Sequence, residues 1–228
     1  MPPRVVLLTL ALLPGCTRGE ALTRPSAADS APPAEATKEI LDPRFVAELR
    51  KVFAGYKAWG RVDDELRWAP FLCRLPEPGK PRMSAAAADS GHAKKLYSLF
   101  AREHADYVAL ATDPAHVAKG EQAVVKESYI PELVTDGSAP SQLFGGPSTP
   151  GDDHFSPYLT QDGKVYRASK IAGLYVILEL PPTTPGTDEG FVYGTLSPDG
   201  EVTSAGRVAS CMGCHLAAKH RRLFGPLR

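Results

Sequence analysis

The feature that most constrains the fold of this chain is a Cys-x-x-Cys-His sequence near its C-terminal end. Cys211 and Cys214 are three residues apart, His215 follows directly, and only residues 216–228 remain. A thioredoxin-like redox motif lies early in a βαβ unit, between a strand and a helix. The thirteen residues after His215 are too few for the rest of that fold. We therefore do not expect a thioredoxin-like domain.

The same spacing is typical of c-type haem attachment. Two thiols three residues apart can both reach the vinyl groups of one porphyrin, and the adjacent His then lies under the iron as its ligand. The sequence therefore predicts one covalent haem c per chain, bound through Cys211 and Cys214, with His215 as the iron ligand.

Two other interpretations of the motif stay open. A structural zinc ion held by Cys211, Cys214 and either His220 or Cys73 is one, although zinc sites rarely need a His directly after the second Cys. A disulfide or redox dithiol between Cys211 and Cys214 is the other. We expect the fourth cysteine, Cys73, to be a buried thiol that packs as a small apolar residue.

The scarcity of methionine bears on the sixth ligand of such an iron. Of three Met residues, Met1 is expected to leave with a signal peptide and Met212 lies inside the attachment loop, which leaves Met83. We expect His220 to be a surface residue beside Arg221 and Arg222. Bis-histidine ligation remains an alternative through one of four residues: His92, His104, His116 or His154. We expect an open or water-filled sixth position, which favours small-ligand binding or catalysis over simple electron transfer.

The N-terminus has the pattern of an export signal. Arg4 precedes a nine-residue apolar run, residues 5–13, which is long enough for a signal peptide and too short to span a membrane. The run ends in Leu-Pro-Gly-Cys, which resembles a bacterial lipobox with Pro14 in an unusual place. We expect residues 1–16 to be a signal peptide and Cys16 to be lipidated, which predicts a periplasmic protein anchored to the membrane through its lipid alone. The alternative is an ordinary signal peptide cut nearby.

Composition divides the rest of the chain. Residues 17–41 are rich in Ala, Pro and Ser and poor in large apolar residues, which predicts a flexible tether before a domain at 42–228. The 26 basic and 26 acidic residues balance, so we expect no nucleic-acid partner.

The domain is predicted to be α+β, a predominantly antiparallel β-sheet with a few helices and a C-terminal covalent haem c site. Asp42 and Pro43 predict a helix start, with apolar residues at helical spacing up to Gly60. Periodicity does not decide residues 95–100. The other expected elements are strands within 122–129 and 165–180, a hairpin over 191–202, and irregular stretches at 70–81 and 136–153.

Three blocks of sequence resemble the cytochrome P-460 family over roughly residues 45–225. They are Gly-His-Ala-Lys-Lys-Leu-Tyr at 91–97, Gly-Glu-Gln-Ala-Val-Val-Lys-Glu at 120–127, and Ser-Cys-Met-Gly-Cys-His at 210–215 followed by Leu-Phe at 223–224. The resemblance implies a mainly antiparallel sheet with haem against it, a homodimer, and a second covalent link from the Lys126 side chain to a haem meso carbon. Lys126 is thereby a candidate catalytic and cofactor-binding residue; the alternative is an exposed lysine flanking a strand.

Family enzymes oxidise hydroxylamine, and the related cytochromes c′-β lack the lysine link and bind nitric oxide or carbon monoxide. The resemblance thus implies a haem protein that acts on or binds small nitrogen species, with a soluble cytochrome as electron partner. A hydroxylamine-oxidising enzyme, a gas-binding protein and an electron-transfer cytochrome all stay open.

The chain departs from the family pattern in its expected distal pocket. Lys94 stands where the family has an Arg, and no motif marks the distal carboxylate. The candidates for that carboxylate are Asp152, Asp153 and Asp162. Five aromatic residues could line the haem, although core packing is the more usual role for each: Tyr97, Phe100, Tyr129, Tyr158 and Tyr175.

Overall fold

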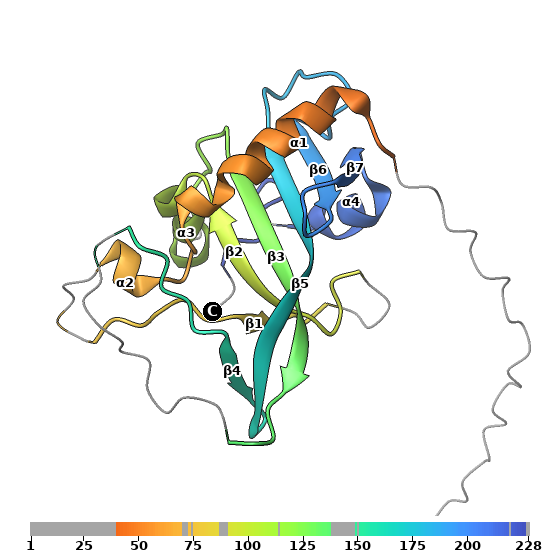
Figure 1. Ribbon diagram of the computed structural model, residues 1–228. Helices are drawn as coiled ribbons and strands as arrows, with labels where there is room; N and C mark the ends of the chain where they lie inside the picture. Colours follow the sequence, from red (N-terminus) through yellow and green to blue (C-terminus); the bar gives the residue numbers. More distant parts are fainter. Residues whose placement is uncertain are drawn as a thin grey trace, which may run out of the picture. The chain divides into compact units, whose positions relative to one another are not determined.

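The structure is a computed structural model that describes most of the chain after residue 39 (Figure 1). The described residues are 40–69, 73, 75–86, 91–113, 115–137, 149, 151–218 and 220–226. The predicted signal peptide with Cys16, nearly all of the predicted tether, and much of the predicted loop at 136–153 lie outside them. No helix within these ranges is both long enough and apolar enough to cross a membrane.

Helix α1, Pro43–Gly55, forms where the sequence predicted it. The Asp42 side chain accepts a hydrogen bond from the backbone N–H of Arg44, and Pro43 occupies the first turn, where its missing N–H costs nothing. A short 3₁₀ helix, η1 (Tyr56–Trp59), continues the chain to Gly60, whose φ of 74° is easy only for glycine.

The strands form an antiparallel sheet in the spatial order β1-β2-β3-β5-β6-β7, with β4 paired to the free end of β5. Their bounds are β1 Arg82–Met83, β2 Leu96–Ala101, β3 Ala123–Leu133, β4 Tyr158–Gln161, β5 Lys164–Glu179, β6 Phe191–Leu196 and β7 Val202–Gly206. The predicted α+β, mainly antiparallel architecture is confirmed at this level. The undecided segment at 95–100 is strand β2, and the predicted hairpin over 191–202 is β6 and β7.

Five short elements escaped prediction. They are α2 (Glu65–Trp68), strands β1 and β4, α3 (His104–Thr112) and α4 (Ala209–His215). Short segments contain too few periods of a hydrophobic pattern for periodicity to identify them. The last of them matters most, because α4 contains the whole Cys-x-x-Cys-His sequence.

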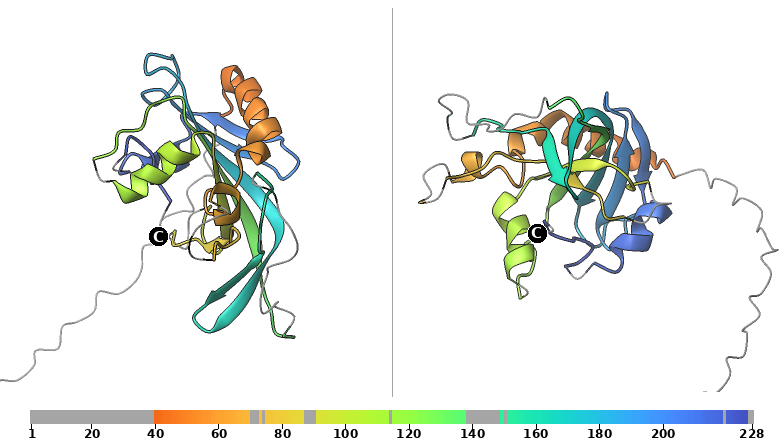
Figure 2. Two further views of the ribbon diagram at one scale, coloured as in Figure 1. Left: turned by 90° about the vertical axis from the view of Figure 1, so that its left-hand side faces the viewer. Right: turned by 90° about the horizontal axis from the view of Figure 1, so that it is seen from below.

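The two faces of the sheet are covered by different elements, with α1 on one side and α3 on the other (Figure 2). On the α1 face, Leu49 packs into one core with Val125 and Val176. The fit is tight: a Cβ added to Gly194 of β6 would come within 2.5 Å of the Leu49 side chain. On the opposite face, Val124 and Tyr193 pack with Val208, Leu223 and the α4 residues Cys211 and Met212.

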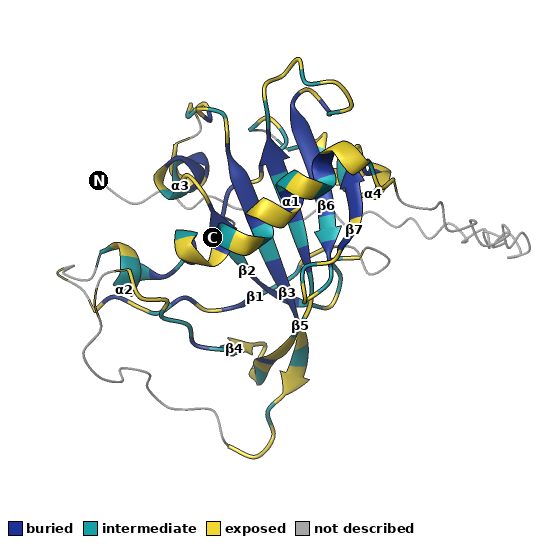
Figure 3. Ribbon diagram, turned by 45° about the horizontal axis from the view of Figure 1, so that its top comes forward, coloured by how far each residue is buried: buried dark blue, intermediate teal, exposed yellow. Residues whose placement is uncertain are grey.

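Burial is concentrated in the centre of the sheet, while the ribbon formed by β4 and the far ends of β3 and β5 is exposed (Figure 3). Two details differ from expectation. Ile40 and Leu41, at the end of the predicted tether, pair with Ala205 of β7. The prediction of a buried Cys73 is wrong: the residue is exposed, because it lies in irregular chain outside the layers that form the core.

Candidate functional site

Helix α4 brings the three residues of the motif onto one side of a single helical turn. Cys211 and Cys214 are three residues apart and His215 is four from Cys211, the spacings at which helical side chains are neighbours. Cys211 is partly buried against the apolar cluster on this face, whereas Cys214 is exposed. No disulfide joins the two, so both thiols are in the state that haem attachment requires.

The imidazole of His215 is held in one orientation. Its Nδ1 lies 2.7 Å from the backbone carbonyl oxygen of Arg222, and the ring is within 4.9 Å of the Phe224 ring. A carbonyl only accepts hydrogen bonds, so Nδ1 carries the proton and Nε2 is left as the nitrogen with a free lone pair. Burial lowers the pKa of His215, and the charge of Lys126 lowers it further, which favours the neutral, metal-binding form.

An ion pair fixes the carbonyl that orients His215. The Arg222 guanidinium donates from Nε and Nη2 to the Asp188 carboxylate at 2.8 and 3.1 Å, and Tyr193 Oη donates to the same group at 3.0 Å. Arg222 has a φ of 67°, a left-handed conformation that is unusual for a residue with a side chain. The bidentate pair holds this turn in place, and so a chain of hydrogen bonds connects the core strand β6 to His215.

Lys126 lies at the centre of the sheet, on the face that also carries α4. It stands on β3 between Leu99 of β2 and Tyr175 of β5, and its Nζ is 4.2 Å from the centre of the Tyr97 ring. Burial, together with the nearby charge of Lys95, lowers the pKa of Lys126 to about 8. Among the described residues no carboxylate forms an ion pair with it. The alternative of an exposed, carboxylate-paired lysine therefore does not describe this residue.

His92 is the other predicted residue that the fold brings to this region. Its ring lies 3.9 Å from the ring of Tyr175, the cross-strand neighbour of Lys126. Its Nδ1 is buried and has no hydrogen-bond partner among the described residues. Burial, followed by the charges of Lys126, His215 and Lys95, lowers the pKa of His92 to about 4. The contact with Tyr175 places His92 on the same face of the sheet as Lys126.

The remaining candidate ligands are engaged elsewhere. Nε2 of His104 bonds the Val62 carbonyl and Nε2 of His116 bonds Asp106, at 3.1 and 2.8 Å. His154 is tied to Asp64 through its backbone N–H and its Nδ1, although its Nε2 is buried without a partner. Met83 packs with Leu96 and Tyr129, on the α1 side of the sheet.

The candidate distal carboxylates do not gather beside Lys126. Asp153 accepts a hydrogen bond from the buried Arg61, Asp152 accepts two from Thr149, and Asp162 is exposed in the turn between β4 and β5. Lys94, which stands in the place of the family's Arg, is exposed in the turn after His92. The sequence suggested these residues by type alone, and the topology separates them from the motif.

The aromatic candidates divide between the two faces. Tyr97 and Tyr175 lie on the Lys126 face, and both are in contact with it or with His92. Phe100 and Tyr129 alternate onto the α1 side, where Phe100 packs edge-on against Tyr56. Tyr158 lies on β4. Only the first two are therefore placed to line a group held by α4.

The residues present fit a c-type haem by their chemistry. One region of the sheet face carries the thiols of Cys211 and Cys214 and the imidazole of His215, whose Nε2 is left for a metal. The Lys126 amine and the His92 imidazole lie in the same region. Within the described ranges, no three His, Cys, Asp or Glu side chains are placed to hold one metal ion together. A haem iron would need only His215 from the motif, because the porphyrin itself would supply four nitrogen ligands.

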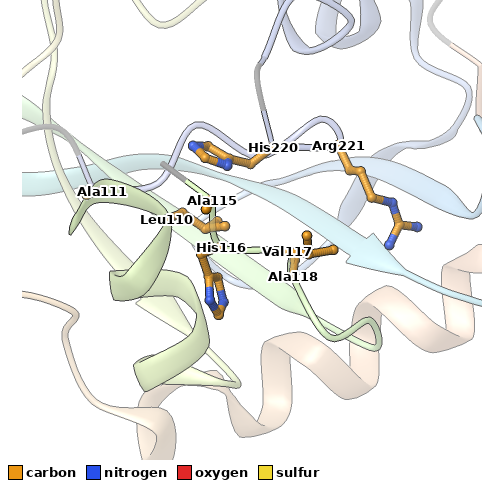
Figure 4. A pocket seen from close by; sticks show the side chains of 8 residues that line it. All are labelled: Leu110, Ala111, Ala115, His116, Val117, Ala118, His220 and Arg221. Carbon is orange, nitrogen blue, oxygen red and sulfur yellow. The ribbon is translucent and has the colours of Figure 1, made fainter. Parts of the chain in front are cut away.

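A separate cavity of about 430 Å³ opens between α3 and the C-terminal residues (Figure 4). Apolar and polar side chains line it together: Leu110, Ala111, Ala115, Val117, Ala118, His116, His220 and Arg221. His220 was expected at the surface beside two arginines; it is half-buried, and Arg221 forms an ion pair with Glu179 at 3.0 Å. Neither Lys126 nor the motif borders this cavity.

Sequence reasoning missed Asp188, Tyr193 and the role of Arg222. No short motif marks them, since Asp188 and Arg222 are 34 residues apart and meet only in the folded chain. Their only signal is an Arg close behind the motif. Comparison of the sequence with models of protein families and with curated proteins gives no match.

Proposed function

We propose that this chain is a monohaem c-type cytochrome whose haem lies between α4 and the sheet face that carries Lys126. The observation that supports it best is the state of His215: its Nδ1–H is bonded to the Arg222 carbonyl, which leaves Nε2 for iron. Each cysteine thiol would add across one vinyl group, so that S–H and C=C become a thioether with no other product. When bound, the haem supplies redox chemistry and an iron that takes small ligands.

The test is production of the full chain in a bacterial host with the c-type haem attachment machinery. We expect an alkaline pyridine spectrum of haem c and a mass increase of one haem that survives denaturation. C211S and C214S should each weaken this attachment, and the double variant should lose it. C73S, the matched control at an exposed cysteine, should leave it unchanged. A wild-type protein without covalent haem contradicts the proposal.

The resemblance to cytochrome P-460 adds the link between Lys126 and a haem meso carbon. Three observations support this: its place on the motif's face, its partial burial, and a pKa of about 8, which leaves more of the amine neutral and nucleophilic near pH 7 than an ordinary lysine has. The bond replaces one N–H and one C–H, so a two-electron oxidant must accept the electrons as two protons leave.

The link to Lys126 can be tested by its spectrum. We expect a strongly red-shifted ferrous Soret band in the wild type and an ordinary one in K126R. Identical spectra would remove Lys126 from the cofactor's attachment.

The substrate class that the resemblance implies is small nitrogen species, hydroxylamine or nitric oxide. One observation favours binding over rapid turnover: Asp152, Asp153 and Asp162 are placed away from Lys126, and proton transfer by a positioned group contributes about 10²–10⁴-fold to a rate. A gas-binding protein like cytochrome c′-β is therefore the second candidate function.

Consumption of hydroxylamine with a soluble cytochrome as electron acceptor supports the enzyme; nitric oxide binding without consumption supports the gas binder. A third candidate, an electron-transfer cytochrome, requires six-coordinate low-spin iron in both oxidation states.

Export and lipid anchoring complete the proposal. Residues 1–16 would direct the chain to the periplasm and Cys16 would hold it to the membrane through its lipid. Fractionation should place the wild type with membranes and C16S in the soluble periplasmic fraction. Equal distribution of the two contradicts the anchor without affecting haem attachment. Sedimentation of the soluble form would test the homodimer that the resemblance implies.

A further inference from the structure

His92 stands out among the residues of the site because the fold holds it in place without giving its buried nitrogen a partner. Tyr175 Oη donates a hydrogen bond to the Gly91 carbonyl at 2.7 Å, and Lys95 Nζ donates to the same carbonyl at 2.6 Å. Lys95 also donates to Tyr175 Oη at 3.2 Å. The turn that carries His92 is thus fastened to the strand next to Lys126.

The unpaired Nδ1 of His92 destabilises the folded chain unless another group pairs with it. A buried polar group without a hydrogen bond carries an energetic penalty, and such groups are uncommon in folded proteins. Nδ1 of His92 is such a group, while its ring packs against Tyr175. Another histidine with an aromatic neighbour, His104, stacks on Trp68 at 3.6 Å and has its Nε2 paired with the Val62 carbonyl. Stacking alone therefore does not require an unpaired nitrogen.

The location indicates what would pair with it. His92 lies against Tyr175, the cross-strand neighbour of Lys126, on the sheet face that also carries α4. Burial lowers the pKa of His92, and a neutral imidazole offers one N–H donor and one acceptor nitrogen. The three aspartates that the sequence offered for this role lie elsewhere.

We infer that His92 is the side chain that hydrogen-bonds a small diatomic or hydroxylamine-like ligand bound on the open face of the haem iron. The inference rests on the proposed function and deepens it, since it names the ligand-facing residue that the sequence pattern left without an assignment. His92 then acts by positioning and polarising the ligand, and the Tyr175–Gly91–Lys95 contacts act by positioning His92.

The test uses the haem-loaded full chain and carbon monoxide as the probe, read by the C–O stretching frequency and the rate of ligand loss. H92F keeps a ring against Tyr175 and removes both nitrogens. We expect a higher stretching frequency and roughly 2- to 10-fold faster loss, as follows from one missing neutral hydrogen bond. H92Q, which restores a donor and an acceptor, should lie between H92F and the wild type. H104F, the matched stacked histidine, should behave as the wild type.

Three results would overturn the inference, and they can be told apart. Equal frequency and rate in the wild type and H92F, with haem attached, defeat the inference alone. A six-coordinate low-spin wild-type iron that becomes five-coordinate in H92F makes His92 an axial ligand and also defeats the open iron site. Absence of covalent haem from the wild type defeats the proposed function and this inference together.

Discussion

Lys126 and Glu127 are adjacent on β3, and their side chains leave the strand on opposite faces of the sheet. Glu127, on the α1 face, is completely buried and accepts hydrogen bonds from Tyr56, Tyr129, Lys57 and Arg61. Lys126, on the α4 face, has an aromatic ring and a repelling cation as its neighbours.

The surroundings of Glu127 and Lys126 distinguish a buried charge that stabilises the fold from one that belongs to a functional site. On the α1 face the buried Glu127 carboxylate finds its hydrogen-bond donors inside the protein, which is the condition for keeping a charge buried. On the α4 face, within the described part of the chain, no carboxylate pairs with the Lys126 amine and no group pairs with His92 Nδ1. A protein keeps this kind of arrangement where a further group completes it, so the contrast points to the α4 face as the functional one.

The largest expected effect is the loss of the Glu127 carboxylate. E127A leaves the buried Arg61 guanidinium with only the half-exposed Asp153 as its ionic partner, and we expect the free energy of unfolding to fall by about 3–5 kcal/mol. K126M removes the neighbouring charge and should change stability by less than about 1 kcal/mol. Denaturant unfolding of both variants measures the two free energies of unfolding. Equal losses would contradict the difference described between the two faces.

A matched pair of glycine substitutions compares the packing of the two faces. In G194A the new Cβ would meet Leu49 at 2.5 Å, so we expect a loss of about 1–3 kcal/mol. In G213A, on α4, the new Cβ has no atom within 4 Å, and better helix propensity should stabilise the chain by about 0.5–1 kcal/mol. Thermal unfolding of the two variants should move in opposite directions; a shift in the same direction would contradict the packing described for one face.

The next largest effect concerns the Asp188–Arg222 clamp, the ion pair that fixes the carbonyl group bonded to His215. D188N weakens the bidentate pair with Arg222 and the contact with Tyr193, and we expect a loss of about 1–2 kcal/mol. In haem-loaded protein the reduction potential should shift as well, because the carbonyl that orients His215 is no longer fixed. E189Q, which removes an exposed neighbour of Arg222, is the control and should change neither quantity measurably.

The last prediction concerns pH. The pKa of Lys126 in the folded chain is about 8, below its ordinary value of 10.5, so between these values the unfolded chain binds more protons than the folded one. Stability of the haem-free protein should therefore rise with pH from about 8 to 10.5 through this group, and K126M should lack that rise. Parallel pH profiles of the wild type and K126M would show that the amine is not buried in the folded state.

Much of this protein could be predicted from local sequence. Asp42 and Pro43 fix the start of α1 because a cap acts on the backbone beside it. The apolar runs give the strands β3 and β5, because side chains of a strand alternate between faces. The Cys-x-x-Cys-His spacing identifies the chemistry of α4, because two thiols and an imidazole on one turn suffice for haem attachment.

Only the tertiary structure decided which distant residues meet that motif. The sequence placed Lys126 in a predicted strand, within the block that resembles the cytochrome P-460 family. Only the register of that strand placed it between Leu99 and Tyr175 on the face that carries the motif. The burial of Cys73 was predicted wrongly and the separation of the three aspartates from Lys126 was not foreseen, since residue type says nothing of what loops pack against. His92 and the Asp188–Arg222 clamp needed contacts between segments far apart in the chain, which follow from how the sheet closes over its two cores and from no local pattern.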